Sequence, residues 1–347
     1  FRTPPPSYMK RPAAQISKRP AADESAEPVP FFDPHFHIWN VSTTTTTGHD
    51  GKVLFAPNGK ELYAKSDYEA EFAKLPHALK FEGGAFIEAV SVCHVGLVGP
   101  DYTAFCLAEA SFASDQLKGG NYVLVPTCAL EQPDVKETLA ELAKDSHVVG
   151  IRQIVNSKPD WPRNGNLGDL IDNPAWREGF AQLKVNGFSF DLQLNPHQFA
   201  KYAAFLSKHP ETTVIIDHLG SPKLEDLCQN AAQYWSGMEA LSKLPRTYVK
   251  ISMLVYVDPD WDKNEAVLAA VHRIIGLFGA ARCMVASNFP VDKKDGWPAD
   301  RLFPAFLEIA ARYSDAERRD LFAGTARRAY VHDVGSGGDR RLTDGIQ

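Results

Sequence analysis

The sequence predicts an α/β protein, a single (β/α)8 TIM barrel, on three observations. Eight short apolar runs rich in Val, Ile, Phe or Tyr lie between residues 31 and 332, as expected of buried strands. Stretches with helical periodicity separate several of them, and strands that alternate with helices form parallel βαβ units, eight of which close into a barrel. No glycine-rich dinucleotide fingerprint follows the first run, so an open doubly wound sheet is the weaker interpretation.

Several helical stretches begin with recognisable capping signals. Asn173 and Asn195 are each followed by proline, and asparagine as N-cap with proline at the first helical position is a favoured pairing. Ser314 and Glu317 have the spacing of a capping box. A third apolar helix face is predicted over residues 267–275. The predicted strands occupy residues 31–35, 85–90, 122–127, 148–154, 188–193, 213–218, 248–252 and 283–287.

The chain divides into three parts of different composition. Residues 1–30 are predicted to form a disordered, low-complexity arm, because they are rich in Pro, Ala, Ser and charged residues with little to pack. Residues 31–334 are predicted to form the barrel and residues 335–347 a flexible tail. Residues 40–80, with a threonine run at 43–47, form an insertion after the first strand, where a barrel has its active-site mouth.

The composition excludes several classes of function. The formal net charge is −6, and a mildly acidic chain without a basic stripe has no electrostatic footprint for nucleic acid. No apolar run approaches the roughly 20 residues that cross a bilayer. Five scattered cysteines without a CxxC pair indicate reduced thiols. We therefore expect a cytoplasmic protein with a small-molecule substrate. A homo-oligomer and organelle targeting by the arm stay open.

Three histidines are the main candidates for chemistry. Side chains alternate along a strand, so His35 and His37 at the end of the first strand point the same way. The sixth strand ends at His218, whose arrival at the same face would complete three nitrogen ligands, a normal set for catalytic zinc. Ordinary packing histidines are the alternative. Asp217, adjacent to His218, is expected to point away from the site.

Two cations lie in otherwise apolar strands. Arg152 is in the fourth strand and Lys250 in the seventh, and buried cations need partners. Pairing with Glu88 and Asp191 in a structural network is one interpretation. The other is that Arg152 and Lys250 bind an anionic or strongly polar substrate. Gln193 is expected nearest the barrel mouth on the fifth strand and is a further candidate for substrate binding.

Short motifs recur in a fixed order over residues 31 to about 332. They read DPHFHIW at 33–39, GIRQ at 150–153, FDLQ at 190–193, IDHLG at 216–220, VKIS at 249–252 and SNFPVD at 287–292, with Glu109 at a further matching position. Together they resemble the amidohydrolase-related family, in its branch of TIM-barrel lactonases and predicted metal-dependent hydrolases. This branch includes sugar-lactone and 2-pyrone-4,6-dicarboxylate lactonases.

The resemblance implies an active site at the histidines and an acidic residue at the end of the last strand, which acts as base and, where metal is present, as ligand. In this chain Asn288 stands there, and asparagine cannot take a proton from water. Asp292 or a histidine of the cluster is the expected substitute base. A divalent metal, zinc foremost, is implied at His35, His37 and His218, although members of the branch differ in whether they need metal.

The leading hypothesis is therefore hydrolysis of a lactone in a small polar or anionic compound. A metal would polarise the carbonyl and activate water; without metal, the histidines would stabilise the developing oxyanion. A metal-dependent decarboxylase of an aromatic or unsaturated acid is the second hypothesis. A non-catalytic binding protein on the same barrel is the third.

Overall fold

The computed structural model describes residues 27–40, 62–89, 99–158 and 168–330. Most of the predicted disordered arm, the threonine run and the C-terminal tail lie outside the described residues. Among the helices that are described, none is long and apolar enough to cross a membrane.

The eight predicted strands are all present and form a closed parallel barrel. Three pair in the order β1-β4-β5 and five in the order β10-β9-β8-β7-β6. Isolated parallel bridges between Leu124 and Val148 and between Phe36 and Phe289 join the two sheets at both edges. The strands are β1 (Val29–Phe36), β4 (Leu79–Ile87), β5 (Tyr122–Val125), β6 (Gly150–Ile154), β7 (Ser189–Gln193), β8 (Val214–Ile216), β9 (Thr247–Ile251) and β10 (Cys283–Val285).

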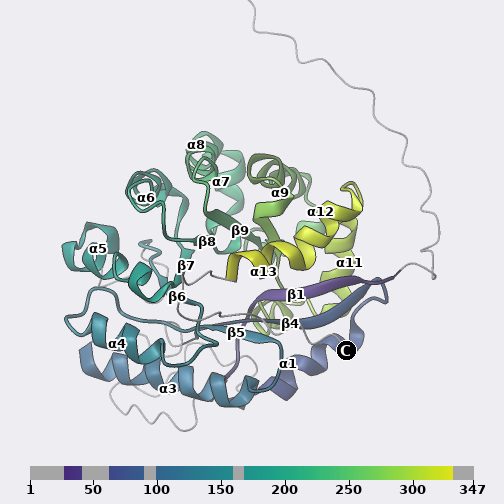
Figure 1. Cartoon of the computed structure of the whole chain (residues 1–347). Helices are drawn as coiled ribbons and strands as arrows, with labels where there is room; N and C mark the ends of the chain where they lie inside the picture. Colours follow the sequence, from purple (N-terminus) through teal and green to yellow (C-terminus); the bar gives the residue numbers. More distant parts are fainter. Residues whose placement is uncertain (1–26, 41–61, 90–98, 159–167, 331–347) are drawn as a thin grey trace, which may run out of the picture.

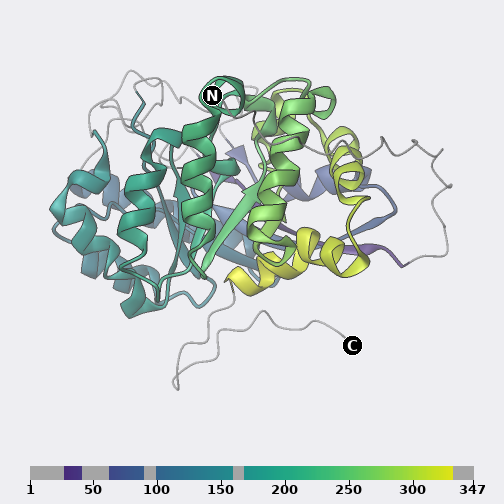
Figure 2. The ribbon, with the colours of Figure 1, turned by 90° about the horizontal axis from the view of Figure 1, so that it is seen from above.

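Helices surround this barrel (Figures 1 and 2). The crossover helices are α1 (Lys65–Glu71), α3 (Gly99–Leu117), α4 (Val135–Leu142), α5 (Pro174–Phe180), α6 (Phe199–Leu206), α7 (Leu224–Cys228), α8 (Ala231–Ser242) and α9 (Glu265–Phe278). After the last strand come α10 (Val291–Lys294), α11 (Ala299–Ala310), α12 (Asp315–Arg319) and α13 (Thr325–Tyr330). A short antiparallel ribbon of β2 (Trp39–Asn40) and β3 (Leu62–Tyr63) belongs to the insertion after β1.

The predicted caps are confirmed. The Asn173 side chain accepts a hydrogen bond from the backbone N–H of Ala175 at the start of α5, and Ser314 forms a capping box with Glu317 at α12. Asn195 occupies the N-cap position of a 3-10 turn, Pro196–Gln198, that leads directly into α6, but its side chain accepts from the backbone N–H of Lys158 and makes no cap hydrogen bond. Local sequence signals therefore fix where these helices begin.

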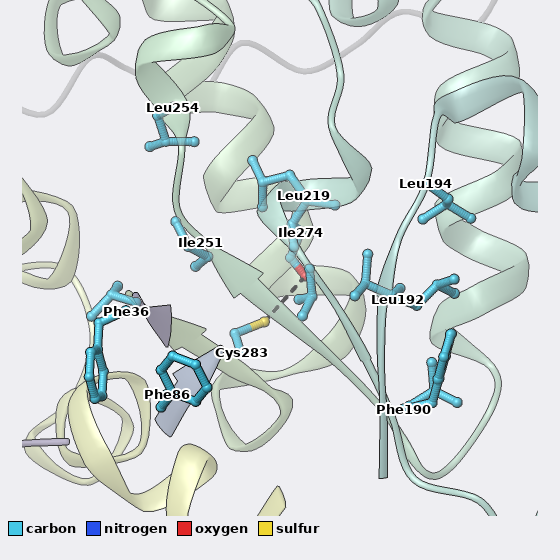
Figure 3. Close-up of a cluster of buried hydrophobic side chains, with 14 of the residues drawn as sticks. Phe36, Phe86, Phe190, Leu192, Leu194, Leu219, Ile251, Leu254, Ile274 and Cys283 are labelled. Atoms are coloured by element: carbon cyan, nitrogen blue, oxygen red, sulfur yellow. Dashed lines mark hydrogen bonds between the residues drawn. The ribbon is translucent and has the colours of Figure 1, made fainter. Parts of the chain in front are cut away.

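The apolar faces of the strands pack against the helices. Figure 3 shows Phe190 and Leu192 of β7 in this layer, with the thiol of Cys283 directed at the carbonyl oxygen of Ile274 in α9. A second apolar cluster fills part of the barrel interior and includes residues of α13, among them the buried Tyr330.

Candidate active site

All the predicted site residues are buried, and most of them converge at the carboxyl ends of the strands. Ring centroids of His35 and His37 are 4.9 Å apart, and those of His35 and His218 are 4.5 Å apart. The predicted convergence of the three histidines is therefore confirmed. The buried set is His35, His37, Arg152, Gln193, His218, Lys250, Asn288 and Asp292.

The three imidazoles are uncharged at neutral pH. Burial, reinforced by Arg152, lowers the pKa of His37 to about 3. Burial also lowers the pKa of His218 to about 3, and burial together with the Lys250 ammonium holds the pKa of His35 well below its ordinary value. Each neutral ring has one N–H and one acceptor nitrogen. His37 Nδ1 lies 2.8 Å from the carbonyl oxygen of Ile87, which can only accept, so we assign the proton to Nδ1 and the lone pair to Nε2.

The ammonium of Lys250 lies at the centre of the cluster. It donates to Asp191 Oδ2 and lies 2.9 Å from Asp217 Oδ1 and 3.2 Å from His35 Nδ1. Burial alone would raise the pKa of Asp217, but the ammonium and His35 hold it well below its ordinary value. Tyr330 also donates to Asp191, over 2.7 Å. The lysine is thus surrounded by acceptors within the barrel.

Arg152 is paired in the same way. Its Nε donates to Glu88 Oε1 over 2.8 Å, and its Nη2 donates to the Glu88 carbonyl oxygen over 2.5 Å. Its Nη1 donates to Gln193 Oε1 over 3.1 Å. The predicted structural network of Arg152 with Glu88 and of Lys250 with Asp191 is present. Substrate binding by Arg152, Gln193 and Lys250 stays a prediction.

The prediction for Asp217 is wrong, because its carboxylate points into the barrel towards Lys250 and Arg152. The reason is the backbone just after β8. His218 has a φ of 56° and Leu219 a φ of 54°, which is the left-handed region and costs about 1–2 kcal/mol per residue. The strand alternation ends there, so Asp217 and His218 both face the site. The His218 side chain contacts Ser252, with the His218 Nδ1 2.8 Å from the Ser252 Oγ.

Asn288 lies between His37 and Asp292. It follows β10 with a φ of 53°, its Oδ1 lies 3.4 Å from His37 Nε2, and its Nδ2 donates to Asp292 Oδ1 over 2.7 Å. Burial raises the pKa of Asp292 well above its ordinary value, although the Asn288 hydrogen bond opposes this. Asp292 Oδ2 has no hydrogen-bond partner among the described residues. Asp292 is therefore a buried carboxyl group that can exchange a proton.

One subset of these groups has the spacing of a metal site. Ligand atoms of His35, Asp217 and His218 all lie within 4.8 Å of one another, close enough to hold a metal ion. This set contains Asp217 in place of the predicted His37. The Lys250 ammonium contacts two of the three groups. A metal ion could use them only if the ammonium moved away.

The fold and site define an amidohydrolase-type barrel, and comparison with known proteins agrees. The amidohydrolase family model matches residues 32–331, so the chain belongs to this family. An uncharacterised protein, y4mH of Sinorhizobium fredii, is 28% identical over 87% of this chain and 98% of its own length. The L-fucono-1,5-lactonase of Burkholderia multivorans is 25% identical over 74% of this chain and 86% of its own length.

Solved structures share the fold at low identity. An amidohydrolase from Burkholderia multivorans with bound zinc has a TM-score of 0.66 and 22% identity, over 87% of this chain and 99% of that one. A probable 2-pyrone-4,6-dicarboxylic acid hydrolase from Acinetobacter baumannii has a TM-score of 0.63 and 15% identity, covering 86% and 98%. A 2,6-dihydroxybenzoate decarboxylase has a TM-score of 0.59 and 14% identity, covering 88% and 99%. These likenesses show the barrel and leave the reaction open.

Proposed function

We propose that this protein hydrolyses a lactone, opening the cyclic ester of a small polar compound. The observation that carries the proposal is the convergence of three neutral imidazoles, backed by the buried cations Arg152 and Lys250. A neutral imidazole has a lone pair that can accept a proton from water, and hydrogen-bond donors nearby stabilise an oxyanion. The relative named as an L-fucono-1,5-lactonase supports the same reaction class.

The residues of the site allow hydrolysis by attack of water followed by opening of the lactone ring. A water held by His37 Nε2 or His218 gives a proton to the imidazole while its oxygen bonds to the lactone carbonyl carbon. Negative charge on the carbonyl oxygen is stabilised by a hydrogen bond from Arg152, whose guanidinium has N–H donors beyond those that Glu88 and Gln193 accept. The bond from the carbonyl carbon to the ring oxygen then breaks, and the ring oxygen takes up a proton. Asp292 is a second source of that proton, because its carboxyl has a raised pKa.

A bound metal would supply a polarised carbonyl and a more acidic water. His35, Asp217 and His218 are the residues that would hold it, in competition with Lys250. Because that ammonium already neutralises Asp217, we propose that hydrolysis proceeds without metal. A metal-dependent decarboxylase is the less favoured function for the same reason.

The reaction class is tested by mass spectrometry of products from a panel of lactones and of aromatic and unsaturated acids. We expect a lactone to gain one water in a reaction that His218→Asn abolishes. His147→Gln is the matched control, because His147 is exposed and pairs with Asp145 far from β8 in sequence. Loss of carbon dioxide from an acid instead would establish the decarboxylase, and no turnover of any compound would favour a binding protein.

A further inference from the structure

Each buried cation of the site already has a carboxylate partner. Among the described residues, Arg152 is matched by Glu88 and Lys250 by Asp191 and Asp217. Asp292 adds a buried carboxyl group to this set, and not a cation. Among the described residues of the site, each cation that a substrate carboxylate would meet already has a carboxylate partner. Transfer of an unpaired charge into such a site is strongly unfavourable.

One polar side chain in the same region lacks a hydrogen-bond partner among the described residues. Asn156 is fully buried, and in the part of the chain that the structure describes neither its Oδ1 nor its Nδ2 forms a hydrogen bond. Buried amides are nearly always hydrogen-bonded, so an exception requires an explanation such as a ligand or ordered water. Ser221, just after β8, is also buried with an unpartnered hydroxyl.

The position of Asn156 places it at the barrel mouth. It follows β6, and the N–H of the preceding Val155 donates to the Gln193 carbonyl oxygen over 2.9 Å. Val155 packs in the outer apolar layer, so strand alternation puts Asn156 on the interior side, as it does Arg152. Lys158 lies 4.0 Å from Asp226, which joins this loop to the segment after β8 that contains Ser221.

We infer that Asn156 binds ring hydroxyl groups of an uncharged, polyhydroxylated substrate, and that the site discriminates against a carboxylated ring. This inference rests on the proposed lactone hydrolysis and names its substrate class. An amide offers one acceptor and two donor hydrogens to a hydroxyl-rich ring. Because both cations are already paired with carboxylates, discrimination depends on hydrogen bonds, which strongly favour the compound that satisfies buried polar groups.

The test measures binding of aldopyranoses and of the corresponding uronic acids to the full chain by ligand-observed NMR. These compounds lack the ester, so binding is separated from turnover. We expect an uncharged pyranose to bind more tightly than its uronic acid, and Asn156→Leu to weaken that binding about tenfold. Asn156→Leu should melt no lower than the wild type, because it removes an amide with no partner. The control is Asn195→Leu, which removes an acceptor used by the Lys158 N–H and should lower the melting temperature.

Tighter binding of the uronic acid, no binding of any pyranose, or unchanged binding by Asn156→Leu would overturn the inference. So would a fall in melting temperature for Asn156→Leu as large as for Asn195→Leu. If lactones are hydrolysed while these results fail, the subsite is wrong and the reaction stands. If pyranoses bind as expected but no lactone is opened, the subsite stands and the proposed reaction is wrong.

Discussion

The ammonium of Lys250 lies 2.9 Å from Asp217 Oδ1, inside the group of residues whose spacing suits a metal ion. Both residues are fully buried. A protein cation therefore already provides the positive charge that a metal would bring to Asp217.

Lys250→Ala should create a zinc site. Removing the ammonium leaves Asp191 and Asp217 buried without their cation, which is unfavourable, and frees the ligand atoms of His35 and Asp217. After exposure to zinc and dialysis, we expect elemental analysis to find about one zinc per chain in this variant and far less in the wild type. Lys201→Ala, which removes an exposed lysine paired with Asp169 and Asp172, is the control. Stoichiometric zinc in the wild type would contradict the role given to Lys250.

The buried His218 should make stability fall in acid. Its ordinary pKa is 6.5, and burial lowers it to about 3 in the folded chain. Between these values the unfolded chain binds the extra proton, so the contribution is present above pH 6.5 and is lost as the pH falls towards 3. His218→Asn should reduce the slope of unfolding free energy against pH by up to about 1.4 kcal/mol per pH unit. Urea unfolding at several pH values measures this, and parallel curves would show that His218 is charged in the folded state.

Asn288→Asp should shift the pH profile of activity. The new carboxyl would lie against Asp292, where Asn288 now donates over 2.7 Å. Two carboxyl groups at this distance share one proton, which raises the second apparent pKa of the pair. We expect the acid limb of the kcat/KM profile to move to higher pH. Asp292→Asn is the control variant, because it keeps the contact with the Asn288 amide but has no carboxyl group. If the acid limb of the kcat/KM profile does not move in Asn288→Asp, residues 288 and 292 take no part in the proton transfer.

Asp33 should be important for stability rather than for chemistry. Its carboxylate accepts from Ser287 N–H over 2.9 Å and from Tyr68 OH over 2.8 Å, so it joins the first strand to the segment after the last. Asp33→Asn would leave buried donors unpaired, and we expect a loss of about 2–4 kcal/mol in unfolding free energy. Asp315→Asn, at an exposed position, should change it by less than about 0.5 kcal/mol. Equal changes in unfolding free energy in the two variants would show that Asp33 does not hold the first strand to the segment after the last strand.

The strands and the three histidines could be predicted because their signals are local. Apolar runs locate the strands, and alternation puts His35 and His37 on one face. The direction of the Asp217 side chain could not be predicted, because the left-handed backbone at His218 ends the strand alternation and no local sequence pattern indicates that backbone conformation. The contact between Lys250 and His35 spans 215 residues of sequence. That Asn156 lacks a hydrogen-bond partner among the described residues depends on all its neighbours, so only the folded chain reveals it.

The most direct test of the account is the rate of proton release from an uncharged sugar lactone by chelator-treated protein. We predict turnover by the wild type and by His147→Gln that chelator leaves unchanged, and loss of turnover in His218→Asn. Activity that disappears with chelator and returns with zinc would contradict the metal-free site built around Lys250. Activity that persists in His218→Asn would contradict the assignment of the histidine cluster as the catalytic centre.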